Sequence, residues 1–496
     1  MPAPLPAVER IELAPGLEVA RVVTGLWQVA DIERVSGTID PDEGARALHT
    51  YLADGFDSFD MADHYGSAEV IAGRLRTALA EGSVAAPPGA KLATFTKWCP
   101  EPGPMTAEVV RRAVDLACRR LATERIDLLQ FHWWLFEHPG WLDAMRELAR
   151  LKEEGRILHL GLTNTDTDHL RVLAAEGIPV VTNQVCVSLL DRRATGPMAG
   201  FCRAHGIRLL AYGTLAGGFL SERWLGRPEP AEIGDWSKMK YRRFIDAAGG
   251  WDVLQAILQA CAEVAKRHGV SISNVATRWV MQQEAVGAVI VGARLGESEH
   301  RNDNRRLFGF SLDETDLQRI DAALAGSRPI PGDCGDEYRR PPFLTASGDL
   351  SHHLDSLPPV YQAVPVDGRP GRLRIDSGSV WEPICGYARA VRIGDRILVS
   401  GTTATHGSGE MIGQGDPAAQ TVYILDKIAA SIRSLGGSMA DVVRTRVYLR
   451  DAEQWEAVSR VHGRYFGEIR PANTLLEVGR LVGDYDVEIE AEAVVG

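Results

Sequence analysis

The sequence predicts two folded units in series, an α/β unit with a parallel sheet followed by a smaller α+β unit. Between residue 57 and about residue 292, short apolar runs alternate with amphipathic helical stretches, a pattern that favours parallel strand pairing. Residues 326–376 are rich in Pro, Gly and polar residues and interrupt this alternation. After residue 377 a hairpin, two helices and further strands follow, and 496 residues are too many for one ordinary domain.

In the first unit, the apolar runs with the length of buried strands are FDSFD, LATFTK, IDLLQF, ILHLGL, PVVTNQ, IRLLAY and GAVIVG. Helical stretches such as AEVIAGRLRTALA separate them, and TIDPDEGARALHTYL near the start predicts another helix. The pattern alone does not identify an eighth strand. A closed barrel and a doubly wound sheet both fit the alternation, but no G-x-G-x-x-G follows the first run, which weakens the doubly wound alternative.

In the second unit, ARAVRIGDRILVSGTTA predicts a two-stranded hairpin with its turn at GD. A helix is predicted at residues 417–435, where two glycines end it. A helix start followed by a strand is predicted in MADVVRTRVYLRD, and a second helix in WEAVSRVHGRYFGEI. Two further strands are predicted in TLLEVGRL and DVEIEAEAVV. We therefore place the first domain at 1–330, a linker or substrate-mouth loop at 331–376, and the second domain at 377–496. Within the middle segment, PGDCGDEYRRPPF carries charged and aromatic residues suited to lining a substrate mouth.

Composition excludes several classes of protein. A net charge of −12 argues against nucleic acid or an anionic membrane as a partner. The seven cysteines form no C-x-x-C pair, so neither a zinc site nor a disulfide framework is indicated, and reduced thiols fit a cytoplasmic protein best. The N-terminal stretch does not look like a secretory signal, and no apolar run reaches membrane-spanning length.

Four residues with complementary chemistry stand at or just past the ends of predicted strands, and they are Asp60, Tyr65, Lys97 and His132. In a parallel barrel the strand ends at one face converge on one pocket. A tyrosine hydroxyl is a poor acid, with an ordinary pKa of about 10, but a neighbouring ammonium favours the phenolate. A carboxylate keeps the ammonium charged, and an imidazole orients a substrate carbonyl. The set suits proton delivery to a carbonyl oxygen.

At these residues the chain resembles the aldo-keto reductase family over roughly residues 10–325. The family's Asp, Tyr, Lys and His occur here in the same order, within a D-x-A-x-x-Y-G-x-x-E segment and after TGLWQ at residues 24–28. The resemblance implies a (β/α)₈ barrel and hydride transfer from NADPH, with NADH as the alternative, to an aldehyde or ketone. It implies Tyr65 as the proton donor.

The resemblance also implies cofactor contacts. Thr163, Asn164 and Gln184 match residues that bind the nicotinamide carboxamide, and Tyr212 matches the residue that stacks on the ring. The expected contacts with the pyrophosphate are the backbone from Gly213 through Leu215 to Gly218. At the adenosine end, a strand is expected to run into a helix N-terminus, where the contacts are Gly292, Arg294 and Asn304. Arg294 favours NADPH because it suits a 2′-phosphate.

Tryptophans flank the catalytic strand ends. Trp27 is expected to contact the cofactor and, with Trp98, Trp133 and Trp134, to build an apolar substrate wall. Among these, Trp98 and Trp133 are the favoured wall residues because each directly follows a catalytic residue. Trp279 is expected in the core.

The second unit resembles the RidA/YjgF family of imine and enamine deaminases over about residues 381–496. The matching text is VSGTTA, LGGSMADVVRTRVYLRD, YFGEIRPANT and VEIEAEA. The resemblance implies a homotrimer, which would also cover the apolar faces of strands such as RILVSG and VEIEAEAVV. Glu488 matches the water-activating Glu, but Asn473 replaces the Arg that grips the substrate carboxylate, and an amide cannot supply that grip.

Three interpretations follow from the two resemblances. The leading one is a carbonyl reductase fused to a trimerising module. The second is an imine or iminium reductase whose second domain acts on related C=N intermediates. The third treats the second domain as a non-catalytic scaffold, or the whole chain as a regulatory subunit.

Overall fold

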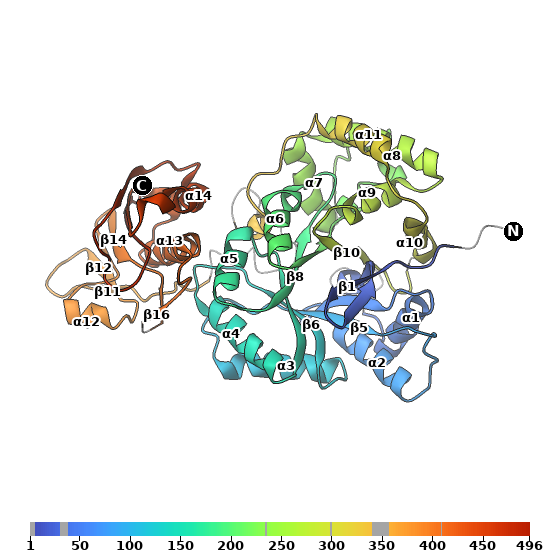
Figure 1. The fold of residues 1–496 in the computed structure, drawn as a ribbon, viewed down its shortest axis with the longest axis horizontal. Helices are drawn as coiled ribbons and strands as arrows, with labels where there is room; N and C mark the ends of the chain where they lie inside the picture. The colour runs from blue at the N-terminus through green and yellow to red at the C-terminus, as the bar shows by residue number, and fades with distance from the viewer. Residues whose placement is uncertain (1–4, 30–37, 234–235, 298–299, 340–356, 408) are drawn as a thin grey trace.

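The computed structural model describes residues 5–29, 38–233, 236–297, 300–339, 357–407 and 409–496. Two domains lie side by side, and the first is a closed eight-stranded barrel in the order β10-β3-β4-β5-β6-β7-β8-β9 (Figure 1). All neighbouring strands pair in parallel, which confirms the (β/α)₈ barrel over the doubly wound sheet. The strands are β3 Val22–Gly25, β4 Ser58–Ala62, β5 Ala93–Trp98, β6 Ile126–His132, β7 Ile157–Thr163, β8 Val180–Cys186, β9 Arg208–Tyr212 and β10 Val286–Gly292.

Helices surround the barrel, and several begin at the caps that the sequence provides. The Asp40 side chain accepts hydrogen bonds from two backbone N–H groups at the start of α1, where Pro41 fits the first turn. The helix expected near the start is thereby confirmed. The helices are α1 Pro41–Ala53, α2 Ala68–Ala80, α3 Ala107–Arg120, α4 Gly140–Glu153, α5 Thr167–Ala175, α6 Pro197–Ala204, α7 Trp236–Ala248, α8 Trp251–His268, α9 Ile272–Met281, α10 Arg301–Arg306 and α11 Glu314–Leu324.

The eighth barrel strand is β3, whose four residues precede the predicted runs. It escapes a pattern search because it is short and is followed by a 3₁₀ turn at Trp27–Val29. An antiparallel hairpin of β1 Arg10–Ala14 and β2 Leu17–Ala20 precedes it. Leu13, Leu17 and Val19 of the hairpin pack against inward-facing apolar side chains of the barrel, so the hairpin covers one end of the barrel interior.

The second domain is a mixed sheet in the order β11-β12-β13-β14-β19-β17-β18 with two main helices. Along β19, buried apolar residues alternate with Glu488, Glu490 and Glu492. The apolar face is therefore covered by helices within the domain, so the argument that this face needs cover from other subunits was wrong. The elements are β13 Ala390–Ile393, β14 Arg396–Thr402, β15 Thr405–His406, β16 Glu410–Met411, β17 Val442–Leu449, β18 Ala472–Glu477, β19 Val487–Val494, α12 Trp381–Cys385, α13 Pro417–Ser434 and α14 Trp455–Phe466.

The segment expected as a linker contains structure. Residues β11 Val364–Pro365 and β12 Arg372–Ile375 extend the second sheet, with β12 pairing antiparallel to β13. A 3₁₀ turn at Asp336–Tyr338 lies against the barrel. Strands β11 and β12 were not predicted because they are short and flanked by Pro and Gly, so they do not show the run of residues that indicates a strand.

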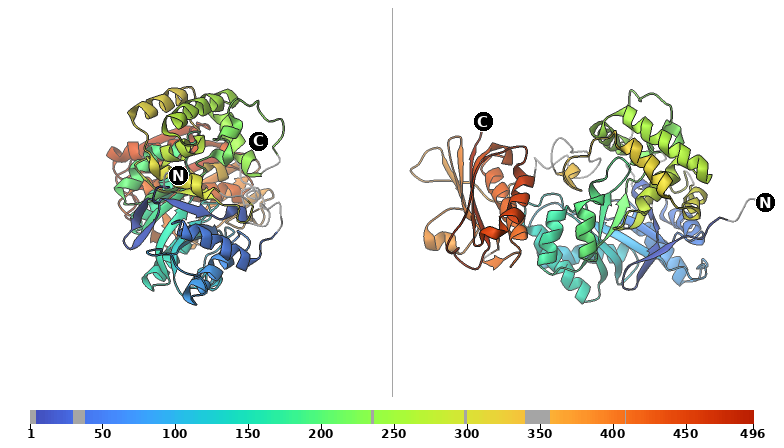
Figure 2. Two further views of the ribbon diagram at one scale, coloured as in Figure 1. Left: turned by 90° about the vertical axis from the view of Figure 1, so that its right-hand side faces the viewer. Right: turned by 45° about the horizontal axis from the view of Figure 1, so that its top comes forward.

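Helices α13 and α14 lie between the second sheet and the barrel, so the other sheet face turns away from the barrel (Figures 1 and 2). Helix α13 packs against α5 of the barrel. Polar contacts across the interface include His406 Nε2 with Asp143 at 2.8 Å and Arg146 with Glu410 at 2.7 Å. Among the described residues, no helix is both long and apolar enough to cross a membrane.

Candidate active site

A cavity of about 740 Å³ opens where the barrel strands end. Parallel strands of a closed barrel end at one rim, so each strand contributes a residue to this wall. The contributions, in strand order from β3 to β10, are Gly25, Asp60, Lys97, His132, Thr163, Gln184, Tyr212 and Gly292. The structure thus brings the strand-end residues expected from the sequence into one cavity.

Asp60 and Lys97 form a buried ion pair on neighbouring strands. Lys97 Nζ lies 2.6 Å from Asp60 Oδ2 and also donates to the Met61 carbonyl at 3.0 Å. The same Nζ lies 4.9 Å from the centre of the Tyr65 ring, which stands in the loop after β4. The Trp27 ring packs edge-on against Tyr65 at 4.9 Å between centroids. The phenol of Tyr65, the ammonium of Lys97 and the carboxylate of Asp60 therefore lie next to one another in space at the cavity wall.

A residue that sequence reasoning missed, Gln130, completes the environment of Asp60. Gln130 Nε2 donates to Asp60 Oδ1 at 2.8 Å, and Gln184 Nε2 donates to the same oxygen at 2.7 Å. Gln130 precedes His132 by two positions on β6, so strand alternation places both side chains on the same, inner face. The sequence signal that could have identified Gln130 is a polar glutamine inside an otherwise apolar strand. Gln184, expected at the carboxamide, thus also holds Asp60.

His132 is a neutral imidazole in this site. Burial holds the pKa of His132 well below its ordinary value, and the nearby Arg339, His64 and Lys97 lower it further. Its Nε2 lies 3.4 Å from Asn164 Nδ2, at the long end of hydrogen-bond range, and its Nδ1 lies 3.6 Å from Cys99 Sγ. A neutral imidazole orients a carbonyl by hydrogen bonding without adding charge to the cavity.

The tryptophans are arranged differently from the sequence expectation. Trp27 and Trp134 line the cavity, whereas Trp98 and Trp133 do not and are buried in the core. Consecutive strand side chains point to opposite faces, so a residue directly after an inward-pointing Lys97 or His132 points outward into the helix layer. The interpretation of Trp98 and Trp133 as wall residues was wrong. Trp279 lies in the core, as expected.

Next to Asp60, Tyr65, Lys97 and His132, the cavity presents groups suited to an amide-bearing ring. Among the described residues, the buried Thr163 Oγ1 and Gln28 Oε1 have no hydrogen-bond partner. Asn164 adopts a left-handed φ of 51°, and its Oδ1 accepts from the Tyr212 hydroxyl at 2.8 Å. Gly292 lies close to Gln28, since a Cβ on it would lie 2.4 Å from Gln28 Oε1.

The remaining wall is mostly basic and comes from the segments after β9 and β10, including residues of helices α7 and α10. Its basic members are Arg223, Lys238, Lys240 and Arg294. It is also lined by Gly213, Leu215, Gly218, His300, Asp303 and Asn304. Eight residues separate the end of β10 at Gly292 from the start of helix α10 at Arg301, so the expectation that the strand runs into a helix N-terminus is wrong. Unpaired amide-binding groups beside a basic wall nevertheless fit a nicotinamide dinucleotide.

Two further residues that sequence reasoning missed, Lys240 and Tyr338, close the cavity beside Tyr212. The buried Lys240 donates to the Tyr338 hydroxyl, and its Nζ lies 4.9 Å from the Tyr212 ring centre. The Tyr212 and Tyr338 hydroxyls are 3.1 Å apart. Tyr338 belongs to PGDCGDEYRRPPF, which the sequence singled out as a substrate-mouth segment. No signal marked Lys240, since it sits in a charged helix.

In the second domain, the two family positions do not share one site within the chain. Glu488 pairs with Tyr448 and Asn473 with Thr445, on opposite sides of β17. Asn473 Nδ2 donates to Thr445 Oγ1 at 2.9 Å. Burial and the nearby Glu490 raise the pKa of Glu488.

Comparison with known proteins agrees with this geometry. Residues 21–325 match the aldo/keto reductase family model, and residues 379–495 match the model described as endoribonuclease L-PSP. An aldo-keto reductase of Mycobacterium sp. (strain KMS) is 27% identical, covering 65% of this chain and 95% of that protein. A RutC family protein of Pyrococcus abyssi is 36% identical, covering 23% of this chain and 88% of that protein.

Among solved structures, a glycerol dehydrogenase from Gluconobacter oxydans is 26% identical, with a TM-score of 0.51, and the match covers 67% of this chain and 98% of that one. The family model spans more than half of the chain, and the closed barrel with its strand-end cavity is the architecture it requires. The chain therefore belongs to the aldo/keto reductase family of NAD(P)-dependent oxidoreductases and carries a RidA/YjgF-like domain after its barrel.

Proposed function

We propose that the protein reduces the carbonyl group of an aldehyde or ketone with NADPH, and that Tyr65 donates the proton. The observation that carries the proposal is the buried Lys97–Asp60 pair, whose ammonium lies 4.9 Å from the Tyr65 ring centre at the cavity wall. This arrangement supplies a proton donor together with a fixed charge that favours the donor's anionic form.

Each residue has a distinct role in the proposal. The Tyr65 hydroxyl gives its proton to the carbonyl oxygen as the carbonyl carbon is reduced, and the product is an alcohol. Lys97 stabilises the phenolate that remains, because an opposite charge nearby favours the ionised form. Asp60 keeps Lys97 charged and oriented through the 2.6 Å contact. The neutral His132 hydrogen-bonds the substrate oxygen and sets its direction towards Tyr65.

The nicotinamide cofactor supplies the hydride when it is bound. Thr163 and Asn164 would hold the carboxamide, Tyr212 would stack on the ring, and Trp27 flanks the reacting end. The backbone from Gly213 to Gly218 would approach the pyrophosphate, although Gly213 and Gly217 already pack closely against Tyr241. Gly292, Arg294 and Asn304 would contact the adenosine end, with Arg294 at the 2′-phosphate.

A substrate panel tests the proposal. The purified chain is given NADPH and then NADH with a set of aldehydes, ketones and cyclic imines, and cofactor oxidation is followed at 340 nm. Turnover of carbonyl compounds by the wild type supports the proposal. Absence of turnover across the carbonyl arm, with nucleotide bound, contradicts it.

A second candidate is reduction of an imine, in which the proton from Tyr65 goes to nitrogen. What favours it is the RidA/YjgF-like domain packed against the barrel, since the resemblance to a family of imine and enamine deaminases implies a substrate with a C=N bond. Turnover confined to the cyclic imines would select this candidate. In that case Glu488→Gln should lower conversion of an imine by the second domain, whereas a scaffold role predicts no change.

A further inference from the structure

The segment Asp333–Arg339, here called the capping segment, forms part of the reductase cavity. Tyr338 lines the cavity, with its ring centre 5.8 Å from that of His132 and 5.6 Å from that of Trp134. Its hydroxyl lies 3.1 Å from that of Tyr212. Tyr338 therefore touches the residues proposed to orient the substrate and to stack on the cofactor.

On the barrel side, the capping segment rests on the backbone of the site. Arg339 donates to the carbonyls of Asn164 and Trp133, each at 2.7 Å. Gly335 has a φ of 91°, and a Cβ on it would lie 2.1 Å from the Asn164 carbonyl oxygen. The segment thus packs directly onto Asn164 and the residue after His132, so its position is linked to theirs.

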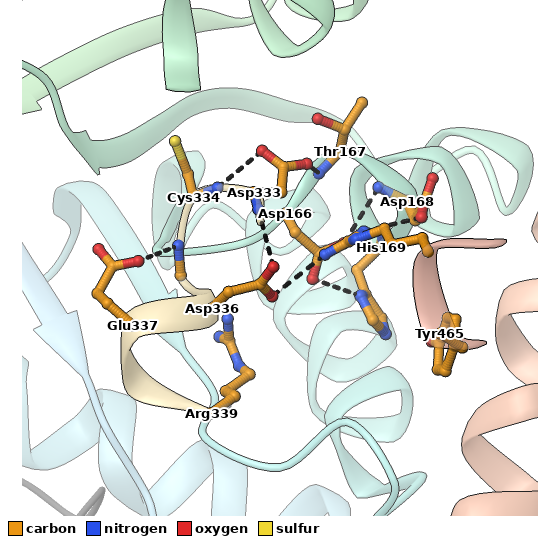
Figure 3. A network of polar contacts seen from close by, with 12 residues as sticks. Asp166, Thr167, Asp168, His169, Asp333, Cys334, Asp336, Glu337, Arg339 and Tyr465 are labelled. Carbon is orange, nitrogen blue, oxygen red and sulfur yellow. Dashed lines mark hydrogen bonds and ion pairs between the residues drawn. The ribbon is translucent and has the colours of Figure 1, made fainter. Parts of the chain in front are cut away.

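On its other side, the capping segment meets a residue of the second domain. Arg464 of α14 donates to Asp166 at 2.7 Å and to Asp168 at 2.8 Å, and its other amino group lies 3.3 Å from Asp336. Asp336 in turn accepts from the Asp333 backbone at 2.8 Å. Figure 3 shows these acidic side chains converging from the capping segment and the start of α5.

Further buried contacts hold the second domain at this point. His169 bridges Asp166, at 2.7 Å, and Asp426 of α13, at 2.9 Å. Tyr465, next to Arg464, donates to Asp426 at 2.7 Å. The His169 ring stacks on the Phe136 ring, with 3.6 Å between their centroids. Phe136 belongs to the same loop as Trp134, which lines the cavity.

The charges show why Arg464 matters. Asp166 and Asp336 are nearly buried, at 2% and 7% side-chain exposure, and Asp168 is close by. Like charges in a poorly solvated site repel strongly, so carboxylates from separate segments gather only around a shared cation. Arginine suits this task because its planar fork presents several donors at once.

We propose that Arg464 is a positioning residue of the reductase: the second domain uses it to hold the capping segment, and through Asp336 it places Tyr338 in the cavity. The expected loss of turnover without Arg464 rests on the proposed function. The expected loss of order in the capping segment does not. The second domain is then part of the reductase site, which goes beyond its interpretation as a scaffold or a separate deaminase.

The test compares full-length Arg464→Ala, Arg464→Lys and Asp336→Asn with the wild type. Arg171→Ala is the matched control, because Arg171 also pairs across the interface, with Asp416 at 3.3 Å, but does not contact the capping segment. Two quantities are measured: amide hydrogen exchange of peptides covering residues 333–339, and kcat and KM with the best carbonyl substrate alongside the nucleotide Kd.

We expect faster exchange in residues 333–339 and a fall in kcat/KM of about 10-fold to 10²-fold, the scale of a small misplacement of a binding group. The Arg464→Lys variant should be intermediate, and Arg171→Ala should match the wild type. Unchanged exchange in Arg464→Ala, or faster exchange with kcat/KM within twofold of the wild type, overturns the proposal. If Arg464→Ala does not fold, Arg464→Lys and Asp336→Asn decide on the same two readouts.

These outcomes separate the two proposals. A wild type without turnover on the whole panel contradicts the proposed function, and the exchange measurement then still decides whether Arg464 holds the capping segment. An active wild type with an unaffected Arg464→Ala variant contradicts only the inference about Arg464.

Discussion

At the scale of the residue, the Lys97–Asp60 pair sets the electrostatics of the cavity. Burying two charges costs several kcal/mol per ion unless other groups satisfy them. Gln130 and Gln184 both donate to Asp60, and the Met61 carbonyl accepts from Lys97. A buried pair of this kind adds little net stability. We infer that its value lies in holding a positive charge beside Tyr65.

One prediction at this scale concerns cofactor selection. Arg294→Ala should weaken NADPH binding by about 10-fold or more, because a charge-assisted hydrogen bond contributes roughly 1.5–3 kcal/mol, while NADH binding should change less than twofold. Fluorescence titration with each nucleotide measures this. Arg306→Ala is the control, since Arg306 lies on α10 outside the main cavity. Equal weakening of both nucleotides would show that Arg294 does not read the 2′-phosphate.

Single residues also show how far the sequence predicts the site. The convergence of Asp60, Lys97 and His132 was predictable because each lies at or near the end of an apolar run and the ends of parallel strands meet at one rim. Tyr65 joins them from the loop that directly follows β4. Trp98 and Trp133 were misassigned because sequence proximity to a catalytic residue was given more weight than strand alternation. Strand alternation applied to β6 places the side chains of Gln130 and His132 on the inner face of the barrel and that of Trp133 on the outer face. Part of this error was therefore avoidable.

At the scale of the element, close helix packing makes one glycine sensitive. A Cβ at Gly73, inside α2, would lie 2.1 Å from the Arg120 carbonyl at the end of α3. Gly73→Ala should therefore destabilise the barrel by about 1–3 kcal/mol, as overpacking does, and lower the thermal midpoint. The control is Gly200→Ala in α6, where a Cβ meets nothing within 4 Å and the gain in helix propensity should be neutral or stabilising by about 0.5–1 kcal/mol. Equal midpoints for both variants would contradict the packing argument.

Long elements were predicted well and short ones poorly. Helix α13 and the hairpin of β13 and β14 follow the expected ranges because their periodicity or turn residues are strong local signals. Strands β3 and β12 have four residues each, too few to show a period, and they form because neighbouring strands offer hydrogen-bond partners. Segment 331–376 therefore looked like a linker although part of it belongs to the second sheet.

At the scale of the whole molecule, the interface joins residues that are far apart in the chain. Arg464 lies 298 positions from Asp166, and nothing in the local pattern around either residue indicates the contact. Such a pair depends on how two complete domains dock, which a sequence read segment by segment does not contain. The dependence of the cavity on the second domain could not have been predicted.

The interface predicts a pH dependence. Burial alone would lower the pKa of His169, but Asp166 and Asp426 more than offset this and raise the pKa to about 9. A raised pKa stabilises the docked form fully below the ordinary value of about 6.5, and this stabilisation is lost as the pH rises through about 9. The shift corresponds to at most about 3 kcal/mol.

Calorimetry of the wild type and His169→Asn between pH 7 and pH 9.5 tests this dependence. The thermal midpoint of the wild type should fall more over this range, because the variant has no imidazolium to lose. Other groups titrate equally in both proteins, so the difference between them isolates His169. Identical pH slopes would contradict a charged His169 at the interface.

Assembly is a further prediction at this scale. Every exposed large apolar side chain among the described residues, except Leu116, belongs to the second domain; Ile384, Ile393, Trp455 and Val482 are more than half exposed. Their concentration in the second domain favours that domain as the site of an interaction surface. Together with the resemblance to a trimeric family, it predicts a homotrimer or a multiple of one. Light scattering of the full chain should give a multiple of three chain masses, and a monomer would contradict this.

The central claim is that Tyr65 supplies the proton in a reduction carried out by the barrel. Its most direct test is the turnover of Tyr65→Phe with the best substrate of the panel, together with nucleotide titration. The account predicts a fall in kcat of about 10² or more, the scale of losing a general acid, with nucleotide affinity retained because the ring and its contact with Trp27 remain. Turnover close to that of the wild type, with nucleotide bound normally, would contradict the account.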